Sequence, residues 1–290
     1  MEKIQKRRDF LKSIGLVAGL SQLPLMGWAE GFATMFQEGV KPLGEFSLLK
    51  IGKLLSGYHF PFVEKFSTDS FKSEFKLYNL YGENATFAGE LALTSVAEGA
   101  TRNFNFSSWR LANNGVMNKD LIYKYIVTGN AICKNNPTFS PQRWNVSSKI
   151  ALSNESIAYK DTGLNYSGIE ANTQIVNDHQ GKLIRKPIGP IPLSWKWGLI
   201  AVVQKMSKES LQELQFSLLD EFDAIYKNQK IRYRKTVTLD CGKGQTLDFK
   251  VFELTGDGIL PTVYWVDNLN RTVFVISGME AFALKNENDV

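Results

Sequence analysis

Residues 230–239 read KIRYRKTVTL, and apolar or long side chains recur there at every second position. Successive side chains of a β-strand point to opposite faces of the sheet, so a period of two is typical of a strand with one buried and one solvated face. After the glycine-containing residues 242–244, Leu247, Phe249 and Val251 repeat the pattern. The segment therefore predicts two antiparallel strands joined by a tight turn.

The same alternation extends over much of the chain. Between residues 73 and 127 it recurs in four runs, separated by Gly-Glu-Asn, Glu-Gly-Ala and Asn-Asn-Gly. Residues 144–152 predict a further strand, whereas residues 155–182 are polar and carry weak strand signals at best. A hairpin over residues 263–276 is apolar on both faces, so we expect it to be central and covered on both sides.

One stretch has the composition of a buried helix. Residues 195–203 are apolar nearly all round, and Ser194 precedes them as a candidate N-cap. A helix with apolar residues on every side must be buried, so we expect a core helix from Ser194 to Met206.

Residues 207–227 fit two patterns. Ser210 and Glu213 match a capping box at the start of a helix, whereas Leu214, Phe216 and Leu218 alternate as in a strand. The pattern favours a helix, and a strand is the alternative for this segment.

These elements predict the α+β class: a large curved antiparallel sheet, half-barrel-like, packed on one or two helices. We expect a single β-rich domain over residues 30–290, with an N-terminal helical segment within residues 30–72. Residues 1–29 are set apart by composition, because a positively charged start is followed by an apolar run and then by small residues before a plausible cleavage point after Ala29.

Residues 7–12 read RRDFLK. They resemble the bacterial twin-arginine export signal, in which Arg-Arg is followed by any residue and then Phe-Leu-Lys. Arg7, Arg8, Phe10 and Leu11 match that pattern. The resemblance implies transient contact with the twin-arginine (Tat) translocase and a mature protein in the periplasm, or otherwise outside the cytoplasm, of a bacterium.

The apolar run of the signal is too short for a bilayer crossing of about 20 residues, so we expect no transmembrane segment after cleavage. Residues 1–29 hold five of the 34 Lys/Arg and two of the 29 Asp/Glu, so they supply +3 of the net charge of +5 and leave +2. This balance and the lack of a basic block give nucleic-acid binding little support.

Residues 258–267 read GILPTVYWVD, and Arg271 follows. This stretch resembles the ending of uncharacterised exported bacterial β-rich proteins, whose sheets are thought to be half-barrels like those of periplasmic lipoprotein carriers. The resemblance spans about residues 195–284. It implies a half-barrel sheet and assigns no functional residue.

Metal and cofactor motifs are missing from the sequence. His59 and His179 have no HxH or HExxH partner, and neither a CxxC pair nor a phosphate-binding glycine loop is present. We therefore expect no metal centre and no cofactor. Cys133 and Cys241 could form a disulfide in an oxidising compartment, and idle thiols are the alternative.

Aromatic residues make up 12% of the chain. Rings that line a concave sheet can bind apolar ligands or stack on sugars, and Trp195, Trp197, Tyr264 and Trp265 are the candidate ligand-binding residues. The alternative is that they fill the space between sheet and helix.

Three functions remain open from sequence. The first is non-catalytic binding of an apolar or carbohydrate ligand by an exported β-rich protein. The second is a glycan-metabolising enzyme that uses paired carboxylates, for which Asp220, Glu221 and Asp223, or Asp240 and Asp248, are candidates. The third is a structural subunit of an exported complex. No catalytic residue can be assigned.

Overall fold

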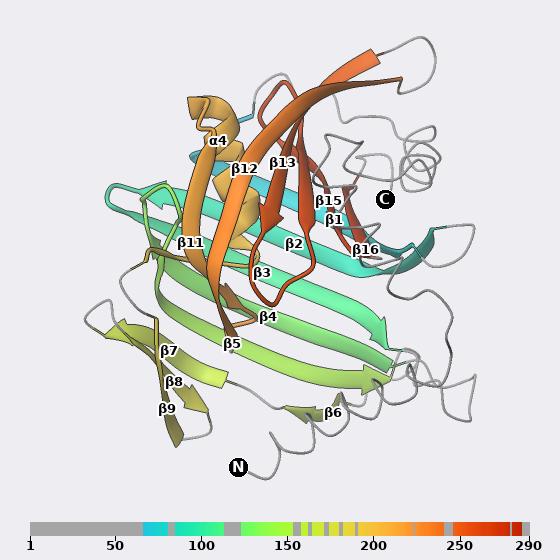
Figure 1. The fold of residues 1–290 in the computed structure, drawn as a ribbon. Coiled ribbons are helices and arrows are strands. Elements are labelled where there is room, and N and C mark those ends of the chain that lie inside the picture. Colours follow the sequence, from blue (N-terminus) through green and yellow to red (C-terminus); the bar gives the residue numbers. More distant parts are fainter. Residues whose placement is uncertain are drawn as a thin grey trace, which may run out of the picture. The chain divides into compact units, whose positions relative to one another are not determined.

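The structure, a computed structural model, describes residues 66–80, 85–112, 123–152, 158–161, 164–170, 174–179, 182–188, 191–222, 224–240, 246–278 and 280–285 (Figure 1). Its strands are β1 (Ser70–Asn79), β2 (Thr86–Glu98), β3 (Thr101–Ala112), β4 (Tyr123–Lys134), β5 (Pro141–Leu152), β6 (Ala158–Asp161), β7 (Leu164–Glu170), β8 (Gln174–His179), β9 (Lys182–Pro187), β10 (Leu193–Trp195), β11 (Glu213–Asp220), β12 (Ala224–Asp240), β13 (Thr246–Thr255), β14 (Thr262–Val266), β15 (Thr272–Ser277) and β16 (Glu280–Leu284). The helix is α4 (Gly198–Glu209).

All sixteen strands belong to one sheet. Its order is β10-β11-β12-β13-β14-β15-β16-β1-β2-β3-β4-β5-β7-β8-β9, and β6 pairs with β5 beside this path. Neighbours are antiparallel except β10 and β11, which are parallel. The pairing of β16 with β1, in which Phe75 lies opposite Leu284, joins the C-terminal and N-terminal strand runs.

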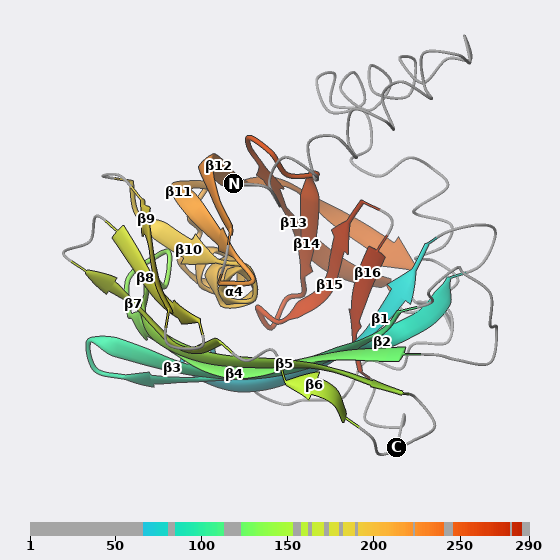
Figure 2. The same ribbon diagram turned by 90° about the horizontal axis from the view of Figure 1, so that it is seen from below.

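The twelve strands from β10 to β5 curl into a nearly closed barrel (Figure 2). Its two ends approach each other, since β10 lies near β5. Aromatic packing connects them: the ring of Trp144 on β5 lies 5.2 Å from that of Phe222, which follows β11. β7, β8 and β9 continue the sheet beyond β5.

This architecture corrects the predicted fold class. The α+β half-barrel packed on helices is wrong, because the described residues are mostly β, with sixteen strands and one helix. Two physical reasons account for the error. The β16–β1 pairing is long-range and leaves no local signal, and the segment at residues 213–220, for which a helix was favoured, is strand β11.

The expected core helix exists and lies against the inner face of the sheet. Residues 198–204 of α4 are all buried, and the Thr272 hydroxyl of β15 donates to the Ile200 carbonyl at 3.2 Å. Ser194 does not cap the helix, because it belongs to β10 and Trp197 occupies the N-cap position. A Cβ at Gly198 would lie 2.2 Å from Nε1 of Trp195, so glycine lets the indole reach the helix start.

The hairpin expected to be covered on both faces is confirmed. Every residue of β14 is buried, and so are the first five residues of β15. Tyr264 faces α4, whereas Trp265 points to the opposite side and packs edge-on against Phe249 with ring centroids 6.1 Å apart. The strand predicted over residues 230–239 is also present, with a bulge between Tyr233 and Lys235.

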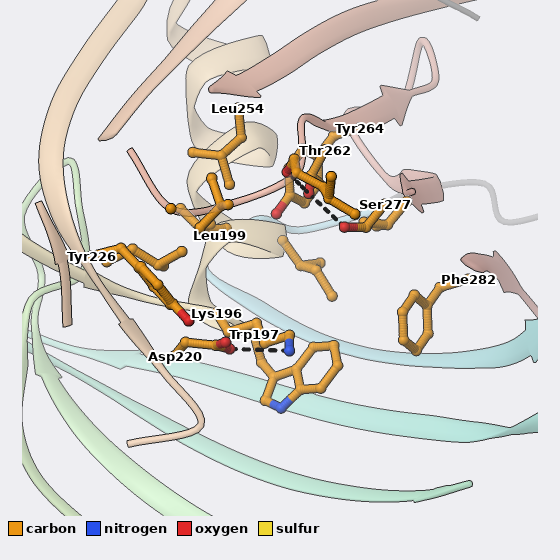
Figure 3. A pocket seen from close by; sticks show the side chains of 16 residues that line it. Lys196, Trp197, Leu199, Asp220, Tyr226, Leu254, Thr262, Tyr264, Ser277 and Phe282 are labelled. Atoms are coloured by element: carbon orange, nitrogen blue, oxygen red, sulfur yellow. Dashed lines mark hydrogen bonds and ion pairs between the residues drawn. The ribbon is translucent and has the colours of Figure 1, made fainter. Parts of the chain in front are cut away.

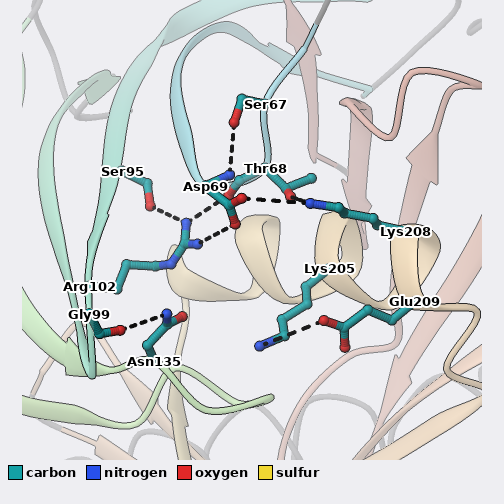
Figure 4. A network of polar contacts seen from close by, with 10 residues as sticks. All are labelled: Ser67, Thr68, Asp69, Ser95, Gly99, Arg102, Asn135, Lys205, Lys208 and Glu209. Carbon is teal, nitrogen blue, oxygen red and sulfur yellow. Dashed lines mark hydrogen bonds and ion pairs between the residues drawn. The ribbon is translucent and has the colours of Figure 1, made fainter.

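A polar network lies near the C-terminal half of α4 (Figure 4). The guanidinium of Arg102, on β3, is 2% exposed and donates at 2.8 Å to the Thr68 carbonyl and to the Ser95 hydroxyl. From the helix, Lys208 donates to the Thr68 hydroxyl at 3.2 Å and lies 3.7 Å from Asp69. The network therefore ties the start of β1 to both β3 and α4.

The segment preceding the sheet is described only in part. Residues 1–65, which include the expected signal and most of the expected helical segment, lie outside the described residues. Among the residues that are described, no helix combines the length and hydropathy needed to cross a membrane.

We expect Arg102→Leu to destabilise the fold by about 2–4 kcal/mol, because it leaves the buried Thr68 carbonyl and Ser95 hydroxyl without their donor. Urea denaturation followed by circular dichroism measures the change. Lys72→Ala is the control, since that side chain is 68% exposed and its loss should alter stability by less than about 0.5 kcal/mol. Equal stabilities of both variants would show that the network does not hold the fold.

Candidate ligand-binding pocket

A pocket of about 240 Å³ lies beside the N-terminal end of α4, against the inner face of the C-terminal strands (Figure 3). Its walls are largely apolar, with Leu199 and Ile200 from the helix and Leu218, Leu254 and Val275 from β11, β13 and β15. The rest of the lining includes a small number of polar side chains. Such a composition is typical of sites for small molecules.

The polar side of the pocket is built around Lys196. Parallel pairing of β10 with β11 places Trp195 opposite Leu219, and the Lys196 amide donates to the Leu219 carbonyl at 3.1 Å. This register brings the Lys196 ammonium next to the end of β11, where Nζ lies 3.0 Å from Asp220 Oδ1 (Figure 3). The same Nζ lies 3.5 Å from Glu221 Oε1.

The two carboxylates change the acidity of the lysine. Burial by itself lowers the pKa of Lys196, but the negative charges of Asp220 and Glu221 outweigh it and hold that pKa above the usual lysine value. Lys196 is therefore charged at neutral pH and occupied as an ion-pair partner.

Hydroxyl groups complete the polar lining. Burial raises the pKa of the Tyr264 phenol far above its usual value, and the charge of Asp220 adds to the rise. Tyr264 is therefore an unionised phenol at neutral pH, able to donate a hydrogen bond. Thr262 and Ser277, which also line the pocket, share a hydrogen bond of 2.9 Å, and Tyr226 of β12 contributes a further hydroxyl to the lining.

A second pocket of about 100 Å³ adjoins the first. Strands β1 to β5 supply much of its lining, including Phe106 and Val127. Lys196, Trp197 and Phe282 border both pockets. The ring of Trp197 meets that of Phe282 edge-on, at 5.5 Å between centroids and 76° between planes.

The structure separates the four aromatic residues that were candidates for ligand binding. Trp197 and Tyr264 come together in the larger pocket. Trp195 is 1% exposed and packs in the core, with its ring 5.2 Å from Phe104. Trp265 is equally buried on the face of the sheet that points away from α4. Trp195 and Trp265 therefore fill space in the core, which is the alternative stated above for these aromatic rings.

The candidate acids take different positions. Asp220 and Glu221 contact the same ammonium, that of Lys196, so they act as its counter-ions. Glu221 has a φ of 48° and Phe222 a φ of 59°, in the left-handed region that side chains disfavour. This turn directs the Phe222 ring into the core and leaves Glu221 beside the smaller pocket. Asp223 lies outside the described residues.

Asp248, from the second candidate pair, accepts a hydrogen bond from the Thr238 hydroxyl across the β12–β13 hairpin. The side chain of its predicted partner, Asp240, is outside the described part of the chain, as are His59 and the side chain of His179. Within the part that is described, no three His, Cys, Asp or Glu side chains are grouped so that they could hold a metal ion.

The structure places Cys133 on β4, where it is fully buried, and burial raises the pKa of its thiol far above the usual range. Cys241 lies outside the described residues, so the disulfide stays a prediction. The signal residues Arg7, Arg8, Phe10 and Leu11 are likewise outside them.

Sequence reasoning missed Lys196 and Phe282 as pocket residues. The signal for Lys196 was available, because it is the one charged residue within the apolar run of residues 195–203. A cation in such a run needs a counter-ion, and Asp220 lies in the nearest acidic cluster. Phe282 carried no signal, since only the β16–β1 pairing and the closure of the barrel bring it to Trp197.

Comparisons with known proteins give a limited result. Neither a protein-family model nor a curated protein matches the chain. Among solved structures, the chain is similar to a β-barrel-like protein of the domain of unknown function DUF1849 from Brucella abortus. The two share 10% sequence identity and a TM-score of 0.48, over 74% of this chain and 95% of that one. At this level of similarity the match informs neither the ligand nor the chemistry of the pocket.

We expect Lys196 and Asp220 to be coupled by about 1 kcal/mol, a value reduced by their partial exposure to solvent. A double-mutant cycle with Lys196→Gln and Asp220→Asn, measured by urea denaturation, gives this coupling. Because the pKa of Lys196 is raised on folding, the coupling should be complete below the pKa of an unfolded lysine, about 10.4, and decline as pH rises through the higher folded value. A coupling that is zero at pH 7, or that does not decline in alkali, would contradict this pairing.

Proposed function

We propose that the protein binds a small, largely apolar ligand in the pocket beside α4 and performs no chemistry on it. The observation that supports the proposal is the combination of aliphatic walls with a few hydroxyl groups, from Tyr226, Thr262, Tyr264 and Ser277. Apolar walls contribute affinity by burying the ligand's surface, and isolated polar groups orient it.

An apolar ligand fits the pocket better than a carbohydrate. A sugar needs many hydrogen bonds and an exposed ring face to stack on. Of the four aromatic candidates, Trp195 and Trp265 are enclosed in packing, and the Trp197 ring is engaged by Phe282. The polar groups present are also partly satisfied, as in the Thr262–Ser277 hydrogen bond.

The place of action that we propose is outside the cytoplasm. The support is the match of residues 7–12 to the twin-arginine signal, and the route would be the Tat translocase of a bacterium. The β16–β1 pairing joins the last and the first described strands, so the barrel forms only when both are present, and a folded barrel is the type of cargo that this route would carry.

The neutral fluorescent probe N-phenylnaphthylamine should bind the mature protein, with a rise in fluorescence and saturation at one site. Val275→Trp places a larger side chain in the pocket, so we expect at least about a tenfold loss of probe affinity. Ile132→Trp is the matched control, because Ile132 is 40% exposed on β4 and should leave affinity unchanged. If the probe does not bind, or if both folded variants bind it equally well, the pocket is not the site.

Replacing Arg7 and Arg8 together by lysine retains the charge but removes the paired guanidinium groups. We expect the precursor to accumulate in the cytoplasm of a bacterium with a twin-arginine translocase, as measured by cell fractionation and immunoblotting. Lys3→Arg should be exported normally. Undiminished export of the double variant would assign the leader to the general secretory route.

A further inference from the structure

The Trp197 side chain lines two neighbouring pockets. The larger, of about 240 Å³, is bounded by α4 and the C-terminal strands, and the smaller, of about 100 Å³, by strands β1 to β5. Lys196, Trp197, Ser277 and Phe282 line both. Trp197 carries the largest side chain of this shared set.

The chain holds Trp197 in place from several directions. It occupies the turn between β10 and α4, where its carbonyl accepts the Ile200 amide at 3.2 Å and its backbone forms the N-cap of the helix. Its ring meets Phe282 edge-on, and the Lys196 ammonium lies 5.4 Å from the ring centroid. That ammonium is itself fixed by Asp220. The indole therefore has a defined position.

The smaller pocket could accept the end of an apolar ligand. Leu77, Phe106, Val127 and Val146 give it an apolar floor. Charged side chains line it as well, and two of them, Arg110 and Glu280, form an ion pair of 2.9 Å. A ligand that passed the indole would thus meet further apolar surface.

We infer that Trp197 is the residue that limits the length of the ligand, by separating the larger pocket from the apolar floor of the smaller one. The inference rests on the proposed binding function. With the indole in place, a straight-chain ligand ends at Trp197. With a small residue at this position, the two pockets become one continuous, longer site.

The test uses isothermal titration calorimetry of the mature protein with straight-chain alcohols from pentanol to undecanol. Each methylene buried should tighten binding about fourfold. For the wild type we expect affinity to rise with chain length and then stop rising. For Trp197→Ala the rise should continue for about two or more further carbons at about the same fourfold step. Trp197→Phe should also increase the chain length at which affinity stops rising, but by fewer carbons than Trp197→Ala.

Phe87→Ala is the control, because Phe87 is 41% exposed and borders neither pocket. In this variant, affinity should stop rising at the same alcohol chain length as in the wild type. Circular dichroism and thermal unfolding verify that each variant is folded, and Trp197→Phe carries the test should the alanine variant not fold. If the folded Trp197 variants show the wild-type limit or bind no alcohol, the role of Trp197 is wrong while the binding function stands. If the wild type binds none of the alcohols, the proposed function itself fails.

Discussion

The antiparallel pairing of β16 with β1 is the interaction on which the rest of the structure depends. It joins strands more than 190 residues apart, with Phe75 opposite Leu284 and Asn79 opposite Glu280. Without it, the strands from β1 to β5 and those from β10 to β16 would be two separate sheets with exposed edges, which invite aggregation. With it, twelve strands form one nearly closed wall, and Phe282 of β16 comes to lie against Trp197.

The parallel pairing of β10 with β11 has a comparable local effect. Because β10 runs parallel to β11, the residue after β10 lies beside the last residue of β11. Lys196 is thereby placed next to Asp220, and Trp197, one residue later, occupies the N-cap position of the helix. The absence of a Cβ at Gly198 allows Trp195 to pack against the helix start. Three consecutive residues thus have different roles: Trp195 packs in the core, Lys196 forms an ion pair and Trp197 lines the pocket.

Local periodicity predicted most of the strands, because alternation of side chains is visible within a few residues. It did not predict the class, since the β16–β1 pair that joins the two strand runs is determined by contacts between Leu77 and Phe282 and their neighbours at opposite ends of the chain. The segment around Leu214 fits both a helical and a strand pattern and favours the helix, but its pairing with Ile231 makes it a strand. For the pocket, composition identified aromatic residues. Only the register could show that Tyr264 faces α4 while its neighbour Trp265 points away.

The size of the barrel explains why a pocket exists and where it lies. The interior of a barrel of about eight strands is filled by the side chains of its own strands. A barrel of twelve strands has a wider interior, which those side chains do not fill by themselves. Helix α4 occupies part of that interior, but twelve helical residues span only about 18 Å. Near its C-terminal half, Lys208 and the buried Arg102 fix the surrounding chain by hydrogen bonds, and Lys250 donates to the Ser207 carbonyl at 2.9 Å. The unfilled space is therefore at the other end, where the helix starts at Trp197, and the residues of that turn determine its dimensions.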